Sequence, residues 1–191
     1  GPLDSLPLYR AELEFDPEAR RVVGQLAITF TARGTTEELF LRVTPNANHP
    51  DAITLSGGKF NELPITLLQP DPSLYQLRVD APLASGTSAT LELKLTARVP
   101  QLPRSSDDAM FDSLQGPGGD YGAFSSSNAM NSLAGLLPMI APMQGNEPFA
   151  GPSGIGDLGT FEPSNFVVSV SVPAGAQVIA PGVLVGEVPA K

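Results

Sequence analysis

Apolar and polar residues alternate along much of this chain. Between Ala89 and Val99, every odd-numbered residue is apolar and every even-numbered residue is polar. A period of two is typical of a β-strand with one face on a core and the other in water. The same alternation predicts strands over residues 9–16, 24–31, 39–43, 75–79 and 166–172, the last with Phe166, Val168, Val170 and Val172 on one apolar face.

Clusters of turn-forming residues separate these stretches. Asp16-Pro17-Glu18-Ala19 predicts the turn between the first two strands, and Thr44-Pro45-Asn46, Gly57-Gly58 and Pro173-Ala174-Gly175 predict later turns. No stretch shows helical periodicity over three turns. Short strands at a spacing of roughly ten residues favour an all-β fold, a twisted antiparallel β-sandwich of about eight to ten strands.

Residues 100–165 depart from the alternating pattern. The stretch 100–135 is rich in Ser, Gly, Asp and Asn, which predicts one long irregular loop. The following segment, Leu136-Leu137-Pro138-Met139-Ile140-Ala141-Pro142-Met143, is apolar but contains two prolines, which excludes a central strand. Residues 6–191 are therefore expected to form a single sandwich domain with an inserted loop. Residues 1–5 are predicted to be the remnant of a cleaved expression tag.

The apolar segment has two interpretations at this stage. Its large side chains could close the sandwich core, or they could form an interface with another domain. Apolar surface left uncovered on a domain of this size favours pairing with a partner. The candidate interface residues are Leu136, Leu137, Met139, Ile140 and Met143.

Charge and hydropathy exclude several classes of partner. The 191 residues carry a formal net charge of -9, and the carboxylates are spread along the chain rather than gathered in a tail. No basic stripe is available to neutralise phosphates, so nucleic acid is not an expected partner. No apolar run approaches the length of roughly 20 residues that a transmembrane helix needs.

Candidate catalytic residues are scarce, because the chain has one histidine and no cysteine. Zinc sites usually need three or four His, Cys or carboxylate ligands, and the softer ligands are missing here. His49 lies among turn residues with no partner at a metal-binding spacing, so a solvated turn histidine is expected. Ser125-Ser126-Ser127 lacks a nearby base, which favours a linker over a nucleophile.

Two further motifs have weak functional interpretations. Asp107, Asp108, Asp112, Asp120 and Asn128 could supply oxygen ligands to calcium, but the spacing of an EF-hand loop is absent and a solvated loop is favoured. The glycine-rich runs 116–119 and 154–159 lack the Lys-Ser/Thr and the helix start of a phosphate-binding loop, so turns are expected.

The order of motifs resembles the N-terminal β-sandwich of M1-family metallopeptidases, the aminopeptidase N and leukotriene A4 hydrolase group. The resemblance rests on "DPEARRVVGQLAITFTA", "EELFLRVTPN", "KFNELPI", "LYQLRVDAPLASGTSATLELKLTARVP", "SLAGLLPMIAP" and "GIGDLGTFEPSNFVVSVSVPAGAQVIAPG" in succession. It covers nearly all of residues 6–182. The long loop and the Met/Pro segment depart from the shorter linker usual in the family.

The resemblance implies that this chain is a non-catalytic domain. In the family, a catalytic domain follows the sandwich and carries a His-Glu-x-x-His zinc motif and a Gly-x-Met-Glu-Asn motif. Neither motif occurs here, no catalytic or metal-ligating residue carries over, and the chain ends at Lys191, where that domain would begin. We therefore expect an inactive N-terminal domain, with no cofactor of its own, that docks on a zinc aminopeptidase domain and helps to wall its substrate cleft.

Alternative functions stay open at this stage. The chain could be a free-standing cell-surface module for protein binding or adhesion, or a relative that has lost its catalytic domain. Glycan binding is disfavoured, because there is no Trp and two of the three tyrosines, Tyr9 and Tyr75, lie on apolar strand faces. The few lysines and many Gly and Pro residues favour an extracytoplasmic bacterial location, whether periplasmic, surface or secreted.

Overall fold

The computed structural model describes residues 5–101, 123–145, 147–149 and 161–188, and in these ranges strands are the main secondary structure. Six strands form one sheet and four form a second, so the two main sheets together match the predicted sandwich. A short 3₁₀ helix, η2 (Thr44–Ala47), connects a strand of the four-stranded sheet to a strand of the six-stranded sheet. The all-β prediction is confirmed.

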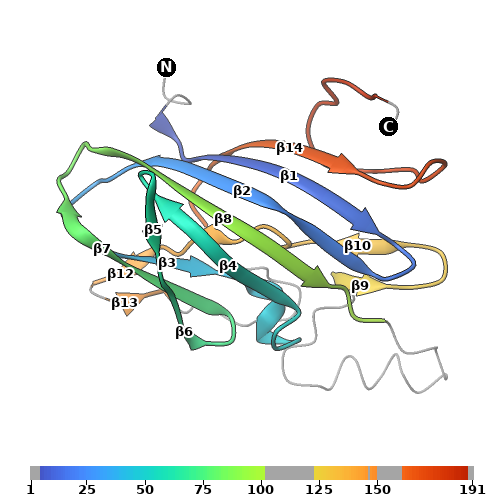
Figure 1. The fold of residues 1–191 in the computed structure, drawn as a ribbon, viewed down its shortest axis with the longest axis horizontal. Coiled ribbons are helices and arrows are strands. Elements are labelled where there is room, and N and C mark those ends of the chain that lie inside the picture. The colour runs from blue at the N-terminus through green and yellow to red at the C-terminus, as the bar shows by residue number, and fades with distance from the viewer. Residues whose placement is uncertain (1–4, 102–122, 146, 150–160, 189–191) are drawn as a thin grey trace.

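The six-stranded sheet has the order β14-β1-β2-β8-β4-β5. Its strands are β1 (Leu8–Asp16), β2 (Arg21–Thr31), β4 (Ile53–Phe60), β5 (Leu63–Ile65), β8 (Ser88–Arg98) and β14 (Asn165–Ser171). Neighbours are antiparallel except for β1 and β14, which run parallel. Figure 1 shows β14, the last strand in the chain, beside β1, the first.

The second sheet has the order β11-β3-β7-β6. It consists of β3 (Thr36–Arg42), β6 (Leu67–Asp71), β7 (Leu74–Leu83) and the two-residue β11 (Met139–Ile140). Two small hairpins complete the described strands: β9 (Phe124–Ser126) with β10 (Asn131–Leu133), and β12 (Met143–Gln144) with β13 (Glu147–Pro148).

The core forms where the inward faces of the two sheets meet, as the alternation predicts. Tyr9, Leu26 and Leu91 from the larger sheet and Leu41 and Leu77 from the smaller one are at most 1% exposed. They belong to one continuous cluster of buried residues. Burial of each large side chain contributes about 1.5–3 kcal/mol, so this cluster is the main source of stability.

Glycine and asparagine produce two local features, and one of them corrects the sequence interpretation. Gly57-Gly58 is not a turn: the two residues lie inside β4, where Gly57 has φ +38° and the register with β8 shifts by one residue. This bulge restores the inward direction of Phe60, which would otherwise point to solvent. The β4–β5 hairpin turns instead at Asn61-Glu62, both with positive φ, as a tight primed turn requires.

The predicted loop 100–135 is shorter than the composition indicates. Residues 102–122 lie outside the described part of the chain, but Phe124 and Ser126 belong to β9 of a hairpin. The Ser127 hydroxyl closes the connecting turn by donating to the Met130 carbonyl at 2.9 Å, and it accepts from the Met130 N–H at 3.0 Å. Polar composition concealed this hairpin because its strands are only three residues long.

The last strand departs from the prediction in its burial. Its residues do form β14, but Phe166, Val168 and Val170 are 49%, 45% and 37% exposed rather than buried. The reason is topological, because β14 is the edge strand of the larger sheet. Local alternation marks which side chains share a face but does not mark how far the opposite sheet extends.

Candidate functional site

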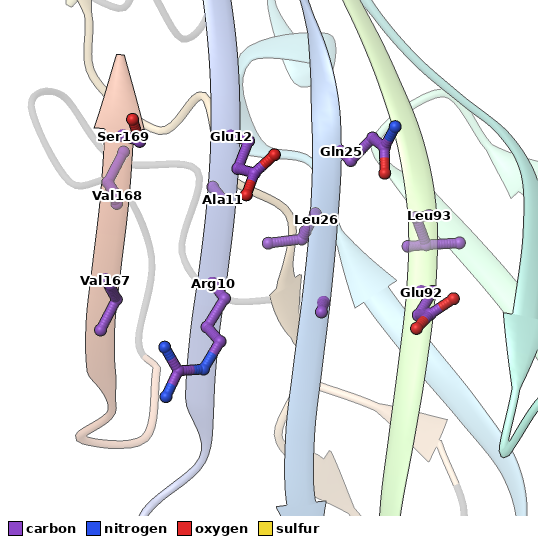
Figure 2. Close-up of a pocket in the computed structure, with 11 residues that line it drawn as sticks. Arg10, Ala11, Glu12, Gln25, Leu26, Glu92, Leu93, Val167, Val168 and Ser169 are labelled. Carbon is purple, nitrogen blue, oxygen red and sulfur yellow. The ribbon is translucent and has the colours of Figure 1, made fainter.

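The outward face of the six-stranded sheet carries a shallow hollow of about 390 Å³. Figure 2 shows Arg10 and Glu12 on β1, Gln25 on β2 and Glu92 on β8 standing along its rim. Strand register explains the hollow. Arg10 lies opposite Ala27, which lies opposite Glu92, so a small side chain sits between two long charged ones.

The hollow holds charges of both signs. Its lining includes neither histidine, serine nucleophile with a base, nor tyrosine. Across the described residues, no group of three or more His, Cys, Asp or Glu side chains could hold a metal ion. The charged side chains that line the hollow are Arg10, Glu12 and Glu92, and they stand beside the amide of Gln25.

The structure divides the predicted interface residues. Leu136 is 6% exposed and belongs to the core, and Leu137, Met139 and Ile140 are partly buried against it. Met143, in β12, is 49% exposed. Since β11 pairs with β3 at the edge of the smaller sheet, most of this segment closes the sandwich, and Met143 is the member of the set that stays accessible.

A polar network ties the end of this segment to the smaller sheet. The Arg42 guanidinium donates to the Phe149 carbonyl oxygen at 3.0 Å and to the Ser73 hydroxyl at 3.1 Å. The Ser73 hydroxyl and backbone N–H in turn donate to Asp71, at 2.6 Å and 2.9 Å. These hydrogen bonds from Ser73, with a smaller contribution from the Arg42 charge, lower the pKa of Asp71. The network therefore positions the β12–β13 hairpin, and with it Met143.

Among the described residues, the remaining sequence candidates do not assemble into a site. His49 lies just after η2, where its N–H donates to the Pro45 carbonyl and its carbonyl accepts from Ala52, which is a structural turn. Ser125 and Ser126 are not a linker but buried residues of β9. Asn128 lies in the turn of that hairpin, whereas Asp107, Asp108, Asp112, Asp120 and both glycine-rich runs fall outside the described residues.

Two surface features escaped the sequence analysis. The hollow is built from single residues of several strands, so no contiguous motif marks it. The exposed apolar residues of β14 gave a signal, their alternation, but it resembles that of a core strand. Only the strand order distinguishes an edge from a centre.

Comparison with known proteins finds solved structures with a similar fold but no match to a family model or a curated protein. Among them are structures of M1 zinc metallopeptidases. A mutant from Deinococcus radiodurans bound to a Tyr-Ser-Ala substrate aligns with a TM-score of 0.62 and 18% identity, over 97% of this chain and 36% of that chain.

Two further structures agree with this match. A second mutant of the Deinococcus radiodurans enzyme gives a TM-score of 0.60 and 20% identity over 94% of this chain and 34% of that one. A two-domain M1 zinc metallopeptidase mutant bound to L-tryptophan gives a TM-score of 0.60 and 18% identity. The alignment covers 94% of this chain and 35% of that chain. The fold expected from the sequence resemblance is thus confirmed, and the chain spans about a third of the length of the structures it matches.

Among the described residues, no helix is long and apolar enough to cross a bilayer.

Proposed function

We propose that this chain is the non-catalytic N-terminal β-domain of an M1-like zinc metallopeptidase, and that it docks on the catalytic domain and helps to wall the substrate cleft. The observation that carries the proposal is the asymmetry of the structural match. Nearly the whole chain, 94–97%, aligns with about a third of each metallopeptidase structure. A complete enzyme of that class would need roughly two further thirds of sequence.

In this proposal zinc belongs to the parent enzyme. The described residues offer no cluster of ligands, which supports a division of labour in which the following domain holds the metal. When bound there, zinc polarises the scissile carbonyl and activates water. The β-domain contributes surface and rigidity, and it excludes water from one side of the cleft.

The first test is the native reading frame beyond Lys191. A His-Glu-x-x-His segment within about one domain's length supports the proposal. A frame that stops near Lys191 contradicts it and leaves the alternative, a free-standing surface module that binds protein. If the frame continues, the downstream domain is expressed separately and its affinity for this chain is measured by calorimetry.

A matched pair of variants tests the docking surface. Because Met143 is exposed and held by a fixed hairpin, Met143→Glu is expected to weaken association with the downstream domain about tenfold or more. Met130→Glu is the control, since Met130 is 68% exposed on the β9–β10 hairpin and lies outside the proposed surface. Equal affinities for the two variants would contradict a docking role for the 136–143 segment.

The proposed location is extracytoplasmic and bacterial. The support is compositional: few lysines and many Gly and Pro residues. Fractionation of the native host, with detection of the full-length protein in the periplasmic, surface or secreted fraction, tests this location. Recovery in the cytoplasm alone would contradict it.

A further inference from the structure

The open edge of β14 is the least protected feature of the described fold. Among the described strands, β14 pairs with β1 alone, so no described strand pairs with its other edge. Its sequence, Asn-Phe-Val-Val-Ser-Val-Ser, has no charge and no proline. Natural edge strands usually carry a charge, a proline or a bulge that prevents pairing with another chain. None of these devices is present here, since the register with β1 runs unbroken through all seven residues.

The backbone groups that face the open side can be assigned. The Asn165 N–H donates to the Pro7 carbonyl oxygen at 2.8 Å, so the peptide groups of Asn165 point toward β1. Successive residues of a strand direct their N–H and C=O groups to opposite sides. Phe166, Val168 and Val170 therefore direct theirs to the open edge.

The described chain that follows β14, residues 172–188, forms no strand ladder with this edge. The Ala176 N–H donates to the Pro173 carbonyl at 3.1 Å, and Gly175 has φ +86°, which is the geometry of a type II turn. Turns of this type splay the flanking segments rather than pairing them, and Pro173 has no N–H with which to close a hairpin. No backbone hydrogen bond joins residues 177–188 to β14.

We propose that β14 pairs antiparallel with β14 of a second copy of this chain, around a two-fold axis at Val168. In that register Phe166 lies opposite Val170 of the second copy, and Val168 lies opposite its own equivalent. All three are residues whose backbone groups face outward, so each pair can exchange both hydrogen bonds of an antiparallel ladder. The result is one continuous sheet across the dimer.

The side chains of β14 are compatible with pairing to a second copy of the same strand. The apolar side chains of Phe166, Val168 and Val170 share one face and meet only one another across the axis. On the other face Val167 lies opposite Ser169, so the pairing brings no like charges together. The strand is thus complementary to itself, whereas the chain as a whole carries a net charge of -9 and repels its copies at long range.

Sedimentation velocity across a concentration series tests the proposal on this chain alone, so the result is independent of the proposed function. An edge-strand interface is small, and the expected dissociation constant is on the order of tens of micromolar. Because the copies repel one another, added salt is expected to strengthen the dimer. A chain that stays monomeric to about 1 mM at high salt would overturn the inference.

Charge variants at the axis test the register. Val168→Lys and Val168→Glu each place like charges opposite one another, and each is expected to weaken the dimer about tenfold or more. A mixture of the two variants is expected to restore a heterodimer, which also shows that both fold. Ser171→Lys is the control, since residue 171 lies at the strand end and meets Asn165 of the second copy.

Three results would overturn the proposed pairing. A dimer that survives Val168→Lys uses another surface. A mixture that fails to form heterodimers excludes the register. Slow amide exchange at Val168 in a monomer, independent of concentration, would show that a segment of the same chain covers the edge.

Discussion

At the scale of single residues, the buried side chain of Asn46 joins three parts of the fold. Its Nδ2 donates to the Ile53 and Pro72 carbonyls, at 2.8 and 3.0 Å, and its Oδ1 accepts from the Ile53 N–H at 2.8 Å. Asn46→Ala removes the side-chain partner of the buried Ile53 N–H and C=O, whereas the Pro72 carbonyl still accepts from Gln69 Nε2 at 3.0 Å. We expect a loss of about 3 kcal/mol in the free energy of unfolding, measured by urea denaturation.

The control for Asn46 is its exposed neighbour. Asn48→Ala removes an amide of the same kind from the same turn and should change stability by less than about 0.5 kcal/mol. Equal losses at the two positions would mean that the turn itself, rather than the buried hydrogen bonds, determines the effect.

Tyr9 couples the two sheets and should make stability depend on alkaline pH. It is 1% exposed, its ring stacks on Phe166 with centroids 5.1 Å apart, and its hydroxyl accepts from the Ile140 N–H at 2.9 Å. Burial, with a smaller effect of the Glu162 charge, raises the pKa of Tyr9 to about 12. The folded state therefore keeps a proton that the unfolded chain loses near pH 10.

The sign of the pH effect follows from that difference. Between pH 10 and 12 the unfolded state binds fewer protons, so stability falls as the pH rises. At pH 9, Tyr9→Phe should be about 1 kcal/mol less stable than the wild type, because the Ile140 N–H loses its partner. By pH 11 the wild type should have lost about 1.4 kcal/mol that the variant keeps. Parallel stability curves from pH 9 to 11 would refute this assignment.

At the scale of strands, a close approach of backbones requires Gly24 in β2. A Cβ at this position would overlap the Glu12 carbonyl oxygen and lie 2.7 Å from Leu13 Cδ2. Gly24→Ala is therefore expected to cost at least about 2 kcal/mol, since the β1–β2 pair must separate locally. Gly34→Ala, where a Cβ meets nothing within 4 Å, should be neutral or slightly stabilising in the same thermal and urea unfolding experiments.

The strands also show what a single sequence can predict. Alternation placed β1, β2 and β8 correctly, because each has one buried and one solvated face, and it identified Tyr9 and Tyr75 as core residues. It missed the bulge at Gly57, because two glycines favour a turn equally well. It also assigned Phe166 to the core, because burial at a sheet edge depends on strand order and on the extent of the other sheet.

At the scale of the whole molecule, the candidate site was less predictable than the fold. The sequence marked the apolar segment 136–143 as a departure from the alternating pattern. In the structure Leu136 is buried and Met143 is exposed, a difference that depends on three-dimensional packing. The hollow bounded by Arg10, Gln25 and Glu92 depends on the register of three strands. Ordered motifs could indicate the fold, whereas surface function depends on residues that are distant in sequence.

The isolated chain is expected neither to bind zinc tightly nor to hydrolyse peptides. The chain has one histidine and no cysteine, and the residues that the structure describes hold no cluster of ligands for a catalytic zinc ion. Added zinc or EDTA should therefore move the midpoint of thermal unfolding by less than about 1 °C, because a ligand stabilises only the state that binds it. Aminoacyl substrates should show no turnover that a chelator abolishes. A stoichiometric zinc signal by mass spectrometry of the native protein, with chelator-sensitive hydrolysis, would mean that the chain carries a catalytic centre of its own. It would also remove the reason for assigning the chemistry to a following domain.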